Sequence, residues 1–507
     1  MAYPQKMMVF PTQSRRGFVY LAAILWGLSV VSLGALFLSD LDYGGSESRY
    51  YLLPFSFLAG VIFVLPCLYY LYKNRFDPFH PLIFLSWNYF LPGFFAGGLA
   101  IALGFTNPYI LSLIQDERYN FPLTFAFVII AYLSLAAGFA LPYTSRFGHW
   151  IAERTRTFEL PSERILIPSL VLLTIGVANT VIGFRLGIFG FQRAEDSGTF
   201  YGIIFLISMF WTEACFLLWL YIFRRDKLQG KEYLIISALV VMSIANLAFQ
   251  GNRGSLGHDV ILMAFAYSLS GRKITLKQSA IGAGLVAVAL VVGIIYGTTF
   301  RNIKGSDQQI SFDQYSNIIP TTISKLSDQD FSTISQNGFS ALTQRIDLLS
   351  PLAVVVSNYE ALEPYEEAWG IANNIYVDTV IFFIPRVIWP DKPVPIDASK
   401  YGDLYFNFAE NSFSMTPMGD LLRNFGPIGI PIGMLILGVI IRLIYSAFVE
   451  RQTFSYFRAT MFYMMFSNIA FEGTFGLIIP MLFKIGIASF VGLMIVRLLS
   501  GPAKARP

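Results

Sequence analysis

Charged residues are scarce in this sequence, and their scarcity excludes most classes of soluble protein. Only 13% of the 507 residues are charged, whereas 55% are hydrophobic and 16% are aromatic. Soluble domains carry about 25% charged residues, so this composition belongs to the membrane class. Apolar runs long enough to cross a bilayer recur almost without pause, which predicts one helical bundle with one large insert.

Cysteine and histidine are also rare. Cys67 and Cys215 both fall inside apolar runs, so the sequence indicates no disulfide framework. It also contains no Cys/His cluster, phosphate-cradling glycine loop or serine nucleophile elbow. Asp328 and Asp330 have the Asp-x-Asp spacing of some metal-dependent glycosyltransferases, but paired acids in an acidic segment are usually only solvated. We therefore expect no metal, no cofactor and, without a basic tail, no nucleic-acid partner.

Hydropathy and length predict an all-α polytopic membrane protein with about twelve transmembrane helices. The expected spans cover about 17–38, 51–72, 80–104, 121–143, 165–187, 203–223, 234–249, 256–270, 278–299, 427–448, 459–475 and 477–498. Nine of them form an N-terminal bundle over residues 1–299, and three more, with a tail, occupy residues 427–507. The seventh and eighth are short, so one re-entrant or broken element remains an alternative for that pair.

Cationic residues mark alternate connections between these spans, and Lys and Arg favour the cytoplasmic side of a membrane. This bias predicts that both termini are cytoplasmic. The cations concerned are Lys73, Arg75, Arg146, Arg154, Arg156, Arg164, Arg224, Arg225, Lys227, Lys231, Arg272, Lys273, Lys277, Arg451 and Arg458.

Residues 300–426 then form one large outer loop, which we expect to be folded because it is far longer than an ordinary connection. The loop holds eight Lys/Arg and fifteen Asp/Glu, a net charge of −7, whereas the rest of the chain carries +11. This balance predicts a solvated segment. Its apolar stretch from Val377 to Trp389 is too short to span a membrane, so short helices at the outer interface are expected.

Cations near the outer boundary are few, and each is a candidate ligand for a lipid-linked phosphate, because guanidinium groups near hydrocarbon need a counter-charge. Structural alternatives exist: Arg423 has the i, i+3 spacing of an ion pair with Asp420, and Arg386 can stack on Trp389. The candidates are Arg253, Arg301, Arg345, Arg386, Lys392 and Arg423.

Two carboxylates, Glu472 and Asp420, lie near the same boundary. An intramembrane carboxylate is a functional candidate by default, although Lys484 offers Glu472 a structural partner. We regard Glu472 as the better candidate for a general base. Trp389 lies between prolines in the loop, where its ring can stack on a sugar or anchor the chain in the interface.

The order of these pieces resembles the Wzy-type oligosaccharide repeat-unit polymerases, also called O-antigen polymerases. The resemblance covers about residues 251–438. The segments that carry it are GNRG at 251–254, RIDLL at 345–349, IPRVIWPDKP at 384–393 and GDLLRNFGPIGIPIGM at 419–434.

This resemblance implies a GT-C-like glycosyltransferase of the bacterial inner membrane. It would join undecaprenyl-diphosphate-linked oligosaccharides at the periplasmic face, for lipopolysaccharide or exopolysaccharide, with a chain-length regulator and a flippase as further partners. The arginines named above, with Lys392, would bind the diphosphate and stabilise its departure. Glu472 or Asp420 would deprotonate the acceptor hydroxyl.

Two other functions remain open. A lipid-linked oligosaccharide transporter also needs cations beside a cavity, although transporters usually carry charges near the midplane and show internal repeats, which are absent from this sequence. The related O-antigen ligases are thought to use an outer-loop histidine, and residues 300–426 contain none.

Overall fold

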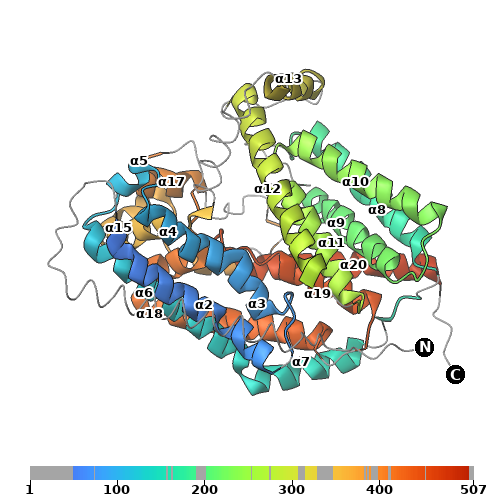
Figure 1. Ribbon diagram of the computed structural model, residues 1–507, viewed down its shortest axis with the longest axis horizontal. Coiled ribbons are helices and arrows are strands. Elements are labelled where there is room, and N and C mark those ends of the chain that lie inside the picture. Colours follow the sequence, from blue (N-terminus) through green and yellow to red (C-terminus); the bar gives the residue numbers. More distant parts are fainter. Residues whose placement is uncertain are drawn as a thin grey trace.

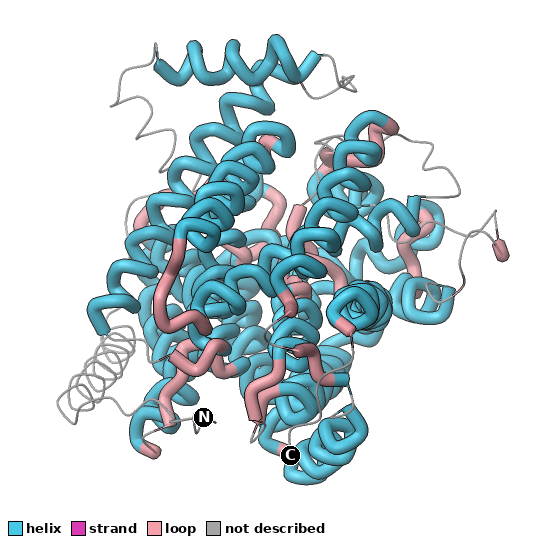
Figure 2. The backbone as a smooth tube through the Cα atoms, turned by 90° about the vertical axis from the view of Figure 1, so that its right-hand side faces the viewer, coloured by secondary structure: helices cyan, strands magenta, loops and turns pink. Residues whose placement is uncertain are grey.

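In the computed structural model, all regular structure of the described residues is helical (Figures 1 and 2). The structure describes residues 49–73, 75–155, 158–161, 164–189, 201–252, 254–272, 276–305, 314–327, 346–381, 384, 388–389, 398–408, 413–450 and 453–501. Within these ranges, nine helical segments are long and apolar enough to cross a membrane. The chain is a multi-pass membrane protein.

Most expected spans correspond to observed helices within a few residues, whereas the first, at about 17–38, lies outside the described residues. The nine candidate spans are η1 and α2 (Tyr50–Tyr72), the continuous run of α3, η2 and α4 (Pro81–Ala102), α6 (Glu117–Ala140), α8 (Leu166–Arg185), α9 (Tyr201–Phe223), α10 (Gly230–Gln250), α12 (Leu276–Lys304), α18 (Thr416–Phe448) and α20 (Phe475–Ser500).

Two expected spans are much shorter than a bilayer crossing. Helix α11 (Ser255–Leu269) has 15 residues and α19 (Tyr456–Ser467) has 12. A helix needs about 20 residues to cross the hydrocarbon core. The apolar run that predicted a span at about 459–475 therefore holds a short helix followed by irregular backbone.

The seventh and eighth expected spans are separate helices that run in opposite directions. At one end the Tyr296 hydroxyl of α12 donates to the Ala248 carbonyl oxygen of α10 at 3.1 Å. At the other end Gln278 of α12 donates to the Tyr267 hydroxyl of α11 at 3.1 Å. Gly251 makes the turn between α10 and α11 with φ +57°, a conformation that glycine adopts without steric cost.

The remaining helices are too short or too polar to be candidate spans: α5 (Pro108–Ser112), α7 (Pro142–Thr155), α13 (Tyr315–Ser327), α15 (Leu349–Trp369), α16 (Asn374–Ile381) and α17 (Ala398–Phe406). Both views place α13 at the edge of the bundle, across the end of α12 (Figures 1 and 2). The other helices from residues 300–426 pack against the spans: α15 contacts α6 and α18, and α16 contacts α20.

Helices α6 and α18 lie side by side and make the closest helix contact of this region (Figure 1). A Cβ atom at Gly138 would overlap the Leu435 carbonyl oxygen, and a Cβ atom at Gly438 would overlap the Leu135 carbonyl oxygen. Between membrane helices, small residues allow this approach of two backbones. The two glycines therefore set the distance between α6 and α18.

Replacing Gly138 by alanine is expected to destabilise the protein, because the added methyl group forces α6 away from α18. Overpacking of this kind costs about 1–3 kcal/mol. The matched control is Gly284→Ala, because a Cβ there meets no described atom within 4 Å. Thermal unfolding in one detergent measures both. Equal midpoints for the two variants would contradict the close contact.

The sequence predicted that the acidic insert is solvated. In the structure, the first half of α15 is instead buried in the bundle. Eight consecutive residues, from Leu349 to Val356, are buried. Before them, the Leu348 N–H donates to the Gly93 carbonyl oxygen of η2 (Ser86–Ala96) at 3.0 Å. Asp347 is only 8% exposed, and its Oδ1 accepts hydrogen bonds from the first backbone N–H groups of α15.

Burial raises the pKa of Asp347 to about 6, against about 3.9 in an unfolded chain. Because the folded state holds this proton more tightly, Asp347 contributes most stability below about pH 4, and that contribution is lost as the pH rises through 6. The expected loss is about 2–3 kcal/mol. The unfolding midpoint is expected to fall as the pH rises from 4 to 7, both in wild type and in the exposed control Asp226→Asn. A slope that persists in Asp347→Asn would contradict the assignment.

Candidate functional site

The first part of α18, residues 416–425, forms a separate helix in front of the spanning part. Gly426 has φ 64° and ψ −167°, which residues with a Cβ rarely adopt, so the helix is interrupted there and restarts at Pro427. Residues Thr416 to Arg423 are all buried. Leu421 packs back against Gly429, which brings the short helix beside the start of the spanning part.

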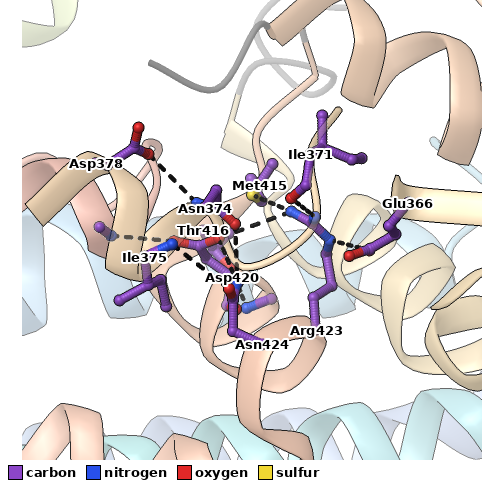
Figure 3. A network of polar contacts seen from close by, with 12 residues as sticks. Glu366, Ile371, Asn374, Ile375, Asp378, Met415, Thr416, Asp420, Arg423 and Asn424 are labelled. Carbon is purple, nitrogen blue, oxygen red and sulfur yellow. Dashed lines mark hydrogen bonds and ion pairs between the residues drawn. The ribbon is translucent and has the colours of Figure 1, made fainter. Parts of the chain in front are cut away.

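Arg423 lies at the centre of a buried polar network on this short helix (Figure 3). Its Nε donates to Glu366 Oε1 of α15 at 2.6 Å, and its Nη2 donates to the Ile371 carbonyl oxygen at 3.1 Å. The third nitrogen, Nη1, lies 3.2 Å from the Met415 sulfur and 3.7 Å from Asp420 Oδ1. All three guanidinium nitrogens are thus occupied by protein atoms.

Two tyrosines of α17 close the other side of Arg423. The guanidinium carbon lies 5.6 Å from the Tyr401 ring centroid and 5.5 Å from the Tyr405 ring centroid, within cation–π range. The Tyr405 hydroxyl donates to Glu366 Oε1 at 2.8 Å. Burial raises the pKa of both tyrosines, so both hydroxyls remain neutral.

Asp420 joins this network to the start of α20. Its Oδ2 accepts from the Gly476 N–H at 3.1 Å, in the first turn of α20. Thr474, the residue at the N-cap position, makes no side-chain cap to that helix. A carboxylate at a helix N-terminus satisfies free N–H groups and interacts favourably with the helix dipole. Asp420 therefore caps α20 from another helix.

Asn424 connects the same short helix to α16. Its side-chain nitrogen donates to Asn374 Oδ1 at 2.9 Å and to the Asp420 carbonyl oxygen at 2.8 Å. Asn374 in turn donates to Asp378 Oδ2 at 3.4 Å. Figure 3 shows Arg423 with Glu366 on one side of the short helix, and Asn424 with Asn374 and Asp378 on the other.

This network bears on two candidate residues from the sequence. Arg423 is held by protein groups, and the ion pair with Asp420 that was its structural alternative is present. Asp420 is 0% exposed, and its oxygens are engaged by Gly476, Asn424 and Arg423. Together Arg423 and Asp420 hold α15, α16, α18 and α20 in place.

Glu472, in contrast, lies in irregular backbone between α19 and α20 and is partly exposed. The helix expected over this stretch ends at Ser467, and α20 begins at Phe475. Phe471 anchors the stretch, with its ring centroid 5.2 Å from that of Tyr89. Glu472 lies four residues before Gly476. Because Asp420 accepts a hydrogen bond from the Gly476 N–H, the end of the connection that carries Glu472 is fixed to the short helix of α18.

The other candidate residues are not brought together by described contacts. Arg301 lies in the last turn of α12, and Tyr296 and Phe300 of that helix belong to a second apolar cluster with α8, α10 and α13. Trp389 is 38% exposed. The convergence of the arginines on one cavity stays a prediction, because the remaining candidates lie outside the described residues. These are Arg253, Arg345, Arg386 and Lys392.

Sequence analysis missed two carboxylates. Glu366 is buried against Arg423, which lies 57 positions away, and no local pattern distinguishes it from neighbouring acidic residues. Glu213 carries a clearer signal, since it is the one charged residue in the apolar run of α9. It is 0% exposed beside Gly492, and its carboxylate oxygens have no hydrogen-bond partner among the residues described.

Within the part of the chain that the structure describes, no group of three or more His, Cys, Asp or Glu side chains is arranged to hold a metal ion. Both cysteines are free, as the sequence predicted. Comparisons with protein-family models, with curated proteins and with solved structures found no match for this chain.

Proposed function

We propose that this chain is an integral-membrane glycosyltransferase that polymerises oligosaccharide repeat units carried on a polyprenyl diphosphate. In this proposal the nine candidate spans, the expected span at about 17–38 and the shorter helices α11 and α19 together form the bundle in the bacterial inner membrane. Both termini are cytoplasmic, and residues 300–426 face the periplasm. The four segments that resemble Wzy-type polymerases support this class of enzyme. The Lys and Arg residues in the connections expected on the cytoplasmic side support this orientation.

The observation that carries the proposal is the irregular connection between α19 and α20, two helices that pack against each other with the Phe457 and Phe490 ring centroids 6.1 Å apart. Irregular backbone at membrane depth is tolerated only where protein buries it or where it lines a cavity. Here the connection carries Glu472, a partly exposed carboxylate, four residues before the Gly476 N–H from which Asp420 accepts a hydrogen bond. A site of this kind suits a general base that must be fixed in position and reachable by substrate.

In the proposed reaction, a hydroxyl oxygen of the acceptor sugar attacks the anomeric carbon of the donor. A new glycosidic bond forms, and the bond from that carbon to the diphosphate oxygen breaks. The proton of the hydroxyl passes to Glu472, and the electron pair leaves with the polyprenyl diphosphate. Arg386 and the other loop cations would stabilise this leaving group, and Trp389 would stack on a sugar.

A transporter of the same lipid-linked oligosaccharide is the second candidate, because it also needs cations beside a cavity of the bundle. A gel assay separates the two functions. Purified protein in proteoliposomes, incubated with a lipid-linked repeat unit, is expected to yield a ladder of products spaced by one repeat. Movement of unchanged lipid carrier across the bilayer without a ladder would support transport. Transfer of the glycan to a lipid A acceptor without a ladder would support a ligase.

The same assay tests the loop cations. Arg386→Ala is expected to abolish the ladder, and Arg118→Ala is the matched control, because Arg118 is exposed at the start of α6. Arg49 is less suitable as a control, since it forms an ion pair with Glu117 that joins the starts of α2 and α6. A ladder of wild-type intensity from Arg386→Ala would remove that residue from the site.

A further inference from the structure

Helix α7 presents an aromatic face away from the protein. Tyr143, Phe147 and Trp150 are 75%, 53% and 46% exposed. Their spacing of four and three residues places them on one side of the helix. The opposite side, with Gly148 and Ala152, is buried, and Gly148 packs against Ser446 of α18. The aromatic face is therefore the side of α7 that its packing on α18 leaves uncovered.

Two arginines accompany these rings. The Arg154 guanidinium carbon lies 3.7 Å from the Trp150 ring centroid, and that of Arg146 lies 5.6 Å from the Tyr143 centroid. The Phe147 and Trp150 rings are stacked, with centroids 5.3 Å apart. Both arginines are exposed. The face thus combines flat aromatic surface with cationic groups, the combination found where membrane proteins meet lipid headgroups.

The position of α7 indicates what covers this face. The membrane-spanning helix α6 ends at Ala140, and α7 begins at Pro142 after a single extended residue. Its buried side lies against the end of α18, where Ser145 donates to Glu450 and His149 lies 3.7 Å from the same carboxylate. The helix therefore starts where one span ends and packs on the end of another, which places it at the edge of the bilayer.

The charge at this end of the bundle favours an anionic surface. The adjacent connections carry Arg224, Arg225 and Arg272, which are joined by contacts from Arg272 to the Arg225 carbonyl oxygen and from Arg224 to the Ser270 carbonyl oxygen. Arg224 also stacks on Phe454, between α18 and α19. Clustered cations beside a membrane attract anionic headgroups.

We propose that α7 lies in the headgroup layer of the membrane and that Arg146 and Arg154 bind the phosphates of anionic phospholipids. Tyr143, Phe147 and Trp150 rest on the boundary between headgroups and acyl chains. The site holds the ends of α6 and α18 at a fixed depth. This inference does not depend on the proposed glycosyltransferase activity.

Native mass spectrometry of the full-length protein, titrated with phosphatidylglycerol or phosphatidylcholine, tests the lipid site. We expect tighter binding of phosphatidylglycerol, weakened about five-fold for each arginine removed in Arg146→Ala/Arg154→Ala. Binding of phosphatidylcholine should stay the same. Arg118→Ala/Lys325→Ala is the control, because it removes two exposed cations elsewhere on the protein. Unchanged phosphatidylglycerol binding in the α7 variant would overturn the proposal.

A second measurement uses wild-type protein and does not depend on how the arginine variant folds. The fluorescence of Trp150 is obtained as the difference between wild type and Trp150→Phe in proteoliposomes. Lipids brominated near the headgroup should quench it, whereas iodide in the water phase should not. Quenching by iodide alone would place α7 in water and overturn the lipid site in favour of a protein partner.

Discussion

Replacing Arg423 by alanine is expected to lower the free energy of unfolding by about 3–5 kcal/mol, because the change leaves buried carboxylates without their cation. Glu366 and Asp420 both pair with Arg423, and the side chains of Arg423 and Asp420 are 0% exposed. The backbone carbonyl of Ile371 also loses its donor. Chemical or thermal unfolding in detergent measures the change, and the exposed residue Arg118, changed to alanine, should alter stability by less than about 0.5 kcal/mol.

A double-mutant cycle tests whether the loss comes from the ion pair. Glu366→Gln alone is expected to destabilise the protein, because it leaves the Arg423 charge poorly paired. In the Arg423→Ala background the same change should cost much less, or stabilise, because it removes an uncompensated charge. Additive effects of the two changes would mean that Arg423 stabilises the fold by packing alone.

Replacing Glu472 by glutamine is expected to reduce polymerisation by roughly 10²- to 10⁴-fold, the usual contribution of a general base. The protein should remain folded, because Glu472 is partly exposed and lies outside the buried network of Arg423. The matched control is Glu363→Gln, an exposed carboxylate of α15. Initial rates of repeat-unit transfer and an unfolding midpoint should be measured on the same preparations.

The two readouts separate catalysis from folding. Lost activity with an unchanged midpoint supports a role for Glu472 in the reaction. Activity within about three-fold of wild type would exclude it as the general base, since even the lower limit for such a residue is about 10²-fold. Asp420→Asn should behave differently, with a lower midpoint, because Asp420 caps α20 and pairs with Arg423.

Much of the helical framework follows from the sequence, because a run of about 20 apolar residues has few alternatives to a membrane helix. The restart of α18 at Pro427 was also predictable from the Gly426-Pro427 pair. The break before α20 was not. Apolar residues continue after Ser467 to Phe475, and hydropathy does not show that the chain leaves the helix at Ser467.

The candidate site was predictable only where its contacts are local. The i, i+3 spacing of Asp420 and Arg423 indicated their ion pair, which the structure contains. The partners Glu366 and Gly476 come from distant segments, and no spacing rule identifies them. For that reason the sequence left Arg423 a candidate phosphate ligand, whereas the fold surrounds it with protein oxygens, sulfur and aromatic rings.

The release of free polyprenyl diphosphate by purified protein tests the central claim most directly. Mass spectrometry of proteoliposomes supplied with a lipid-linked repeat unit counts both the linkages formed and the free carrier. The glycosyltransferase account predicts one free polyprenyl diphosphate for each new glycosidic bond, and none with Glu472→Gln. Carrier that remains fully attached to its glycan, on either side of the bilayer, would contradict it.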